Sequence, residues 1–98
     1  MIRDLPTAER PRDRLLAEGA TYLSNVELLA ILLRTGTKQQ SALGLAQIIL
    51  QQTQGLKLLN EITLEELVSI HGIGESKAIQ ILAAIELGKR TAKAKHIN

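Results

Sequence analysis

A short pattern occurs twice, as SNVELL at residues 24–29 and as TLEELV at 63–68. This repeat constrains the fold more than any other feature of the sequence. In each copy a hydroxyl residue is followed three positions later by glutamate, the capping box that begins an α-helix. Each copy then leads through a glycine-containing turn into an apolar stripe spaced i, i+3, i+4, i+7, typical of a helix buried on one face. The stripes are Ala42, Leu45, Ala46 and Ile49, and Ala78, Ile81, Leu82 and Ile85. The repeat predicts two helix–turn–helix units with approximate two-fold symmetry.

The rest of the chain also favours helices. No segment alternates with period two, and the composition is rich in Leu and Ala with a single aromatic residue, Tyr22. Further helices are expected at 11–18, between Pro11 and the stop at Gly19, and around 56–59. The last helix should run from Glu75 to about Lys93. The sequence therefore predicts one small all-α domain of about five to six helices, because 98 residues cannot build two independent cores.

Composition excludes several protein classes. There is no cysteine, which rules out disulfide scaffolds and Cys-based zinc sites. No apolar run is long enough to cross a membrane, and the beginning MIRDLPTAERPRDR is too charged for a signal peptide. We therefore expect a cytoplasmic protein with no membrane partner.

Few side chains could support catalysis. His71 and His96 are the only histidines, and neither lies in a metal-binding motif. Ser69 and Ser76 lie near His71, but no acid is placed to orient that ring as in a catalytic triad. We expect His71 to be an exposed turn residue. The sequence predicts no catalytic residue, no metal and no cofactor in this segment.

The stretch SIHGIGESKA at 69–78 is the most specific local signal. It is neither a phosphate-binding Walker loop, which has four residues between its glycines, nor a dinucleotide fingerprint, which follows a strand. It fits a hairpin between two helices. Gly72 and Gly74 permit positive φ and leave the backbone bare, so their N–H groups can form an anion-sized concavity with the next helix N-terminus. Ile73 can turn inward, and Lys77 projects near the same spot.

The segment LVSIHGIGESKAIQIL resembles the helix-hairpin-helix motif of proteins that bind DNA without sequence specificity. The resemblance implies that the hairpin N–H groups and the lysine hold the phosphates of one strand. The implied phosphate-binding residues are Gly72, Ile73, Gly74, Ser76 and Lys77. It also implies a monovalent cation bound by the carbonyls of Val68, Ile70 and Ile73.

Two features depart from that motif. Glu75 stands where many such hairpins have proline, and an acid there either opposes phosphate binding or only complements the helix dipole. The first copy has RTGTK in place of Gly-x-Gly, so its hairpin is predicted to be degenerate. Arg34 and Lys38 in that turn either add phosphate contacts or are solvated loop charges.

Nearly the whole chain is similar to the N-terminal domain of the bacterial RadC family. The similarity covers RPRDRLLAEGATYLSNVELLAILLRTGTKQQSALGLAQIIL and IHGIGESKAIQILAAIELGKR. It implies a SAM-like fold, like domain 2 of RuvA, and a link to DNA repair. It also implies a zinc-binding JAB/MPN metallopeptidase-like domain outside this chain. The expected divisions are an N-terminal segment with a short helix at 1–20, a tandem helix-hairpin-helix domain at 21–90 and a basic linker at 91–98.

Two functions follow as alternatives. The first is a DNA-binding module with weak, salt-dependent affinity, because few phosphates could be neutralised. The second is a scaffold that positions the metallopeptidase-like domain or docks another protein, which the modest net charge of +2 and Glu75 favour. The basic run Lys89, Arg90, Lys93 and Lys95 either contacts phosphate or complements its own helix dipole. Dimerisation through an exposed Leu/Ile face fits either function.

Overall fold

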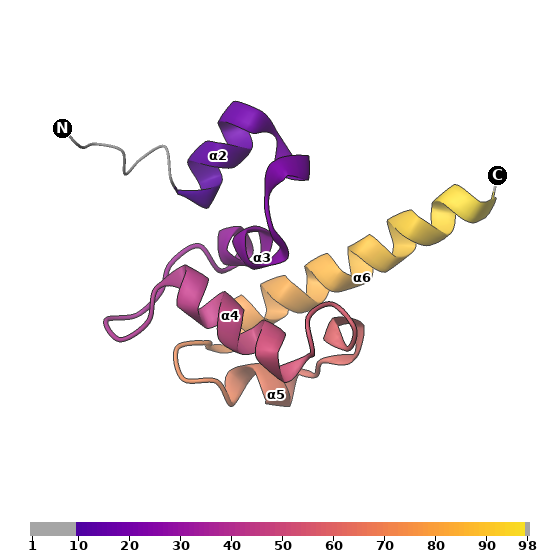
Figure 1. Ribbon diagram of the computed structural model, residues 1–98. Coiled ribbons are helices and arrows are strands. Elements are labelled where there is room, and N and C mark those ends of the chain that lie inside the picture. The colour runs from indigo at the N-terminus through magenta and orange to yellow at the C-terminus, as the bar shows by residue number, and fades with distance from the viewer. Residues whose placement is uncertain (1–9, 98) are drawn as a thin grey trace.

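A computed structural model describes the backbone of residues 10–97 and the side chains of residues 10–94. Within that range the chain is entirely helical and contains no strand, which confirms the all-α prediction (Figure 1). The elements in order are α2 (Pro11–Glu18), η1 (Ala20–Tyr22), α3 (Asn25–Leu33), α4 (Ala42–Gln52), η2 (Leu59–Glu61), α5 (Leu64–Val68) and α6 (Glu75–Ile97), where η marks a short 3₁₀-helix. The region around 56–59 forms turns leading into η2 rather than an α-helix. The irregular segment predicted at 1–9 lies outside the described residues.

Hydroxyl caps fix where three helices begin. Both predicted capping boxes are confirmed: the Glu27 amide donates to Ser24 Oγ (3.2 Å) and the Ser24 amide to Glu27 Oε1 (2.9 Å). Thr63 and Glu66 make the same reciprocal pair at 3.1 and 2.9 Å. Ser41 accepts a hydrogen bond from the amide of Gly44 at 3.0 Å and so caps α4. Each cap satisfies an amide that the helix itself leaves unpaired.

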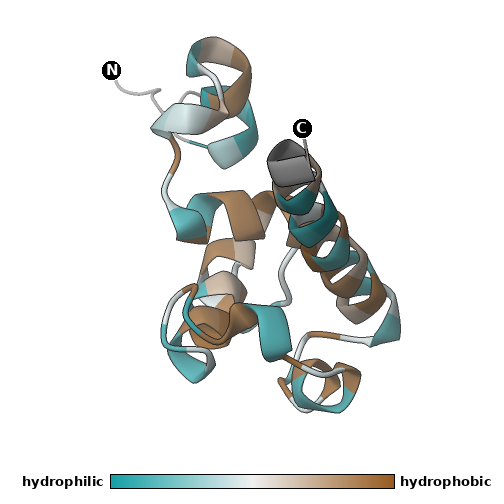
Figure 2. Cartoon of the chain, turned by 90° about the vertical axis from the view of Figure 1, so that its right-hand side faces the viewer, coloured by the Kyte–Doolittle hydropathy of each residue, from teal (hydrophilic) through white to brown (hydrophobic). Residues whose placement is uncertain are grey.

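The core lies where α3, α4, α5 and the first half of α6 meet. Its most enclosed side chains are Leu33, Leu45, Ile49, Leu67 and Ile81. Figure 2 shows that the ribbon of α3 is mostly apolar, whereas α6 alternates between apolar and polar residues. The two predicted stripes face this core, with Ala42, Leu82 and Ile85 partly buried at its edge. Packing of these stripes holds the two repeated units together.

Helix α6 projects well beyond the core (Figure 1). Every side chain from Glu86 to Ala94 is exposed, so nothing in the described part of the chain covers this half of the helix. The radius of gyration is accordingly 14.7 Å, against about 13 Å for a compact chain of this length. The helix also continues to Ile97, past the predicted end at Lys93, and residues 91–97 of the predicted linker are part of it. Alanine and lysine favour helix here, and Glu86 accepts a hydrogen bond from Arg90 at 3.0 Å.

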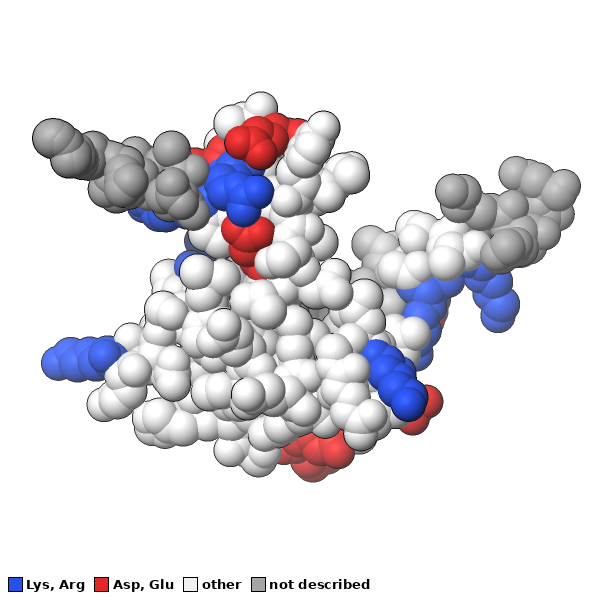
Figure 3. All heavy atoms as spheres, in the orientation of Figure 1, with Lys and Arg blue, Asp and Glu red and all other residues white. Residues whose placement is uncertain are grey.

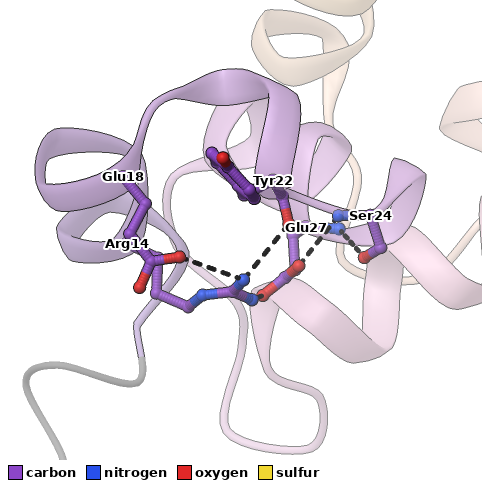
Figure 4. Close-up of polar contacts among 5 residues, drawn as sticks. All are labelled: Arg14, Glu18, Tyr22, Ser24 and Glu27. Carbon is purple, nitrogen blue, oxygen red and sulfur yellow. Dashed lines mark hydrogen bonds and ion pairs between the residues drawn. The ribbon is translucent and has the colours of Figure 1, made fainter.

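Polar contacts attach α2 to the rest of the domain, since none of its side chains is fully buried. Arg14 reaches from α2 to the first turn of α3, where its Nη1 lies 2.5 Å from Glu27 Oε2 (Figure 4). Its Nη2 donates to the carbonyl of Tyr22 at 3.2 Å and lies 3.9 Å from Glu18. The Ser24 amide and then the Arg14 guanidinium hold the pKa of Glu27 below its usual value.

We expect the Glu27 carboxylate to make stability depend on pH. A lowered folded-state pKa means that the contribution is fully present above the unfolded value of about 4.3 and is lost as pH falls through the folded value. As pH is lowered through this range, the thermal midpoint of the wild-type protein should therefore fall more than the thermal midpoint of Glu27→Gln. The glutamine of that variant cannot titrate. Circular dichroism melts of both proteins across the range would measure the difference. A constant gap between the two midpoints at all pH values would contradict the assignment.

Among the described residues, no helix is both long enough and apolar enough to cross a membrane.

Candidate functional site

The second turn, residues 69–74, joins α5 to α6. Gly72 adopts φ 101°, a conformation that favours glycine. Ile73 is 3% exposed, as expected for the residue that turns inward, and its amide donates to the Ile70 carbonyl at 3.0 Å. Both glycines permit positive φ, but Gly74 does not adopt it. It is instead exposed, and a Cβ built on it would meet nothing within 4 Å.

Among the described residues, no side chain caps the amides that begin α6. The first backbone bond of the helix is that from the Ala78 amide to the Gly74 carbonyl, at 3.0 Å. Gly74 has no side chain to accept from the amides of residues 75–77, and no other side chain of the described residues does so. The contrast with the Ser and Thr caps of α3, α4 and α5 is clear. The turn therefore presents unpaired N–H groups at the positive end of the longest helix.

Lys77 connects the two repeated units. Its Nζ donates to the Leu33 carbonyl at 2.6 Å and to Thr35 Oγ1 at 3.1 Å, both at the end of α3. One turn further along α6, Gln80 donates to the Leu32 carbonyl at 3.2 Å. A cation suits the negative end of α3, whose last carbonyls have no helical partner. The ammonium group has three donors, so one remains after these contacts.

The first turn, residues 34–41, has a different structure from the second. Arg34 adopts φ 70° and ψ −55°, and the Thr35 amide donates to the Leu33 carbonyl at 2.8 Å. This is a γ-turn of the rare, strained class. Such a conformation costs a non-glycine residue about 1–3 kcal/mol. The loop is then closed by a bond from the Thr37 amide to the Gln40 carbonyl at 2.6 Å.

The two turns lie against each other. A Cβ on Gly72 would lie 2.9 Å from Thr37 Cγ2 and 3.1 Å from Leu45 Cδ2, so Gly72 is in close contact with the first turn and with α4. The structure thus brings Gly72 and Lys77 into contact with the loop that carries Lys38. Figure 3 shows basic atoms projecting from this loop. Lys38, Glu75 and Ser76 are all exposed, and His71 is exposed as predicted.

Arg34 lies elsewhere. It lines a separate cleft together with Arg10 and Arg12, near the beginnings of α2 and α4. Sequence reasoning did not include Arg10 and Arg12, although the basic string RPRDR at 10–14 was a visible signal. The Ile70 carbonyl, one of three predicted to bind a cation, accepts from Ile73 and keeps one lone pair free. Among the described residues, no cluster of three or more His, Asp or Glu side chains could hold a metal ion.

Comparison with known proteins places the chain in a bacterial family. The family model described as UPF0758 N-terminal matches residues 2–79. A UPF0758 protein of Halalkalibacterium halodurans is 64% identical over 89 residues, which is 91% of this chain and 38% of that protein. Another from Geobacillus thermodenitrificans is 62% identical over 90 residues, covering 92% of this chain and 40% of the relative.

A UPF0758 protein of Bacillus cereus is 57% identical over 97 residues, covering 99% of this chain and 43% of the relative. The chain thus spans about two fifths of the length of these relatives. No solved structure matches it. The family match and these identities show that the chain belongs to the UPF0758 family, the RadC-like family that its sequence resembles.

Proposed function

We propose that this chain is a DNA-binding module that holds backbone phosphates at the second turn without reading sequence. The observation that carries the proposal is the beginning of α6, where no acceptor among the described residues bonds the amides of residues 75–77. Backbone amides at a helix N-terminus suit a phosphate oxygen in both geometry and charge. Ser76 can add its hydroxyl, and Lys38 lies on the neighbouring loop.

Binding of this kind should be weak and sensitive to salt. Amides and lysines contact phosphates, which are the same in every sequence. The Ile73 amide is used inside the turn and Lys77 is half-buried against α3, so only a few groups remain for phosphate. The logarithm of the affinity should fall against the logarithm of salt concentration with a slope of about −0.9 for each phosphate contacted on duplex DNA.

Opposite charge changes at adjacent residues test the proposal. Ser76→Glu should weaken duplex binding about tenfold, because it places a carboxylate at the phosphate site. The fold should tolerate it, since acids suit the first turn of a helix. Glu75→Gln should strengthen binding, because it removes a carboxylate from the same place. Fluorescence anisotropy with labelled duplex DNA over a salt series measures both effects.

Glu61→Gln is the matched control, because it makes the same charge change in η2, away from the turn. Relative to wild type, the affinity of Glu61→Gln for duplex DNA should rise less than the affinity of Glu75→Gln. Wild type that shows no salt-dependent binding, or three variants that bind alike, would refute the proposal.

A scaffold role is the second candidate, favoured by the uncovered half of α6. Leu87 is 64% exposed there, and the relatives are more than twice as long as this chain. In this role α6 packs against the remainder of a full-length protein, where the zinc site implied by the family resemblance would also lie. Titrating the labelled chain with the unmatched part of the Halalkalibacterium halodurans relative should then shift NMR signals of residues 86–94. Unchanged signals there would remove this candidate.

A further inference from the structure

A cleft of about 340 Å³ lies between the beginnings of α2 and α4 and the end of α3. Three arginines line the cleft. Arg10 precedes α2, Arg12 lies in the first turn of α2, and Arg34 follows α3. Its apolar wall includes Ile31 and Leu43. A concavity of this size with a few charged groups is typical of a small-ligand site.

The charges in the cleft are strongly unequal. Asp13 is the one acidic residue that lines it, and its Oδ2 lies 3.5 Å from Arg10 Nε. No other ion pair between the described residues involves Arg10, Arg12 or Arg34. The residues lining the cleft therefore carry a net charge of +2, from three guanidinium groups and one carboxylate. Guanidinium groups bind phosphate oxygens through paired hydrogen bonds.

The backbone of Arg34 is strained. Its strained γ-turn would suit glycine better than any residue with a side chain. The side chain reaches the cleft from that turn and is not needed for the turn itself, because the hydrogen bond that closes it joins Thr35 and Leu33. Arg34→Gly therefore removes the guanidinium while it keeps the hydrogen bond that closes the turn.

We propose that this cleft binds a phosphate group through Arg10, Arg12 and Arg34. The site is separate from the second turn and uses none of its amides. This proposal is therefore independent of the proposed DNA contact at that turn. The phosphate belongs either to a nucleic-acid backbone or to a small phosphorylated molecule. The chemistry of recognition is the same for both, and the experiment separates them.

NMR titration of the labelled chain with inorganic phosphate and with a short DNA duplex tests the cleft. Phosphate should shift the amide signals of Arg34, Ser41 and Leu43 in a saturable way, whereas sodium chloride at the same ionic strength should not. Arg34→Gly should weaken this binding about tenfold, the usual effect of losing a hydrogen bond to a charged group. Its thermal midpoint should stay the same or rise by up to about 4 °C, because strain is relieved.

Two further variants test whether phosphate binding depends on the arginines of the cleft. Arg12→Gln removes a second guanidinium without changing the γ-turn and should also weaken phosphate binding. Arg90→Gln removes the same charge from the projecting part of α6, outside the cleft, and should bind phosphate like wild type. The proposal is overturned if neither probe gives saturable shifts at the cleft, or if Arg34→Gly and Arg90→Gln bind equally well.

The two probes also identify the source of the phosphate. Cleft shifts at lower concentrations of duplex than of free phosphate assign the site to nucleic acid. Shifts with free phosphate alone assign it to small phosphorylated molecules. If the duplex shifts the cleft signals but not those of Gly72 and Gly74, the second turn loses its proposed role while the cleft keeps its own.

Discussion

Gly72→Ala is expected to destabilise the domain by about 3 kcal/mol, enough to lower its thermal midpoint by roughly 12 °C or more. Two costs combine. The φ of 101° is strained for any residue with a Cβ, which costs about 1–3 kcal/mol. The added methyl would also lie 2.9 Å from Thr37 Cγ2 and 3.1 Å from Leu45 Cδ2, and overpacking of this kind costs about 1–3 kcal/mol.

Gly74→Ala is the matched control for this prediction. The two glycines are separated by one residue, but Gly74 has ordinary φ and open space where the methyl would lie. Its free energy of unfolding should therefore stay within about 1 kcal/mol of wild type. Urea unfolding followed by circular dichroism measures both variants. Equal losses of stability at the two positions would show that the turn does not pack as described.

The helices were largely predictable because their signals are local. Ser24 and Glu27, and Thr63 and Glu66, lie within one turn of each other, and their hydrogen bonds need no information from the rest of the chain. The stripes at 42–49 and 78–85 are equally local. The far end of α6 was predicted less well. Its apolar stripe ends near Ile85, whereas helix propensity and the pairing of Glu86 with Arg90 carry the helix further.

The candidate site was predictable only in part. The glycine spacing located the second turn, but it could not distinguish Gly72, which needs positive φ, from Gly74, which does not. The partners of Lys77 lie more than 40 residues away in sequence, at Leu33 and Thr35, so only the folded structure brings them together. The cleft around Arg34 likewise depends on how α2 packs beside α3 and α4. Tertiary contacts of this kind leave no periodic signal in the sequence.

Gly36→Ala is the second variant with a large expected effect, and it tests whether the first turn is a closed structure or an open polar loop. A Cβ on Gly36 would collide with the Gln40 carbonyl and lie 2.6 Å from the carbonyl carbon of Ser41. These are backbone atoms, which cannot rotate away. We expect a loss of about 3 kcal/mol, at the upper end of the range for overpacking. In an open loop the same change would instead be neutral or stabilise by about 0.4–1 kcal/mol.

Gly44→Ala is the control for Gly36→Ala, because its added methyl would collide with a side chain and not with backbone atoms. A methyl there would collide with the end of the Gln40 side chain, which can rotate away, and would lie in ordinary contact with Ser41 Oγ at 3.5 Å. Because Gly44 lies within α4, alanine should leave stability unchanged or raise it by up to about 1 kcal/mol. Urea unfolding of both variants decides the matter. A stable Gly36→Ala protein would mean that the loop opens readily, and the γ-turn that aims Arg34 into its cleft would then be one conformation among several.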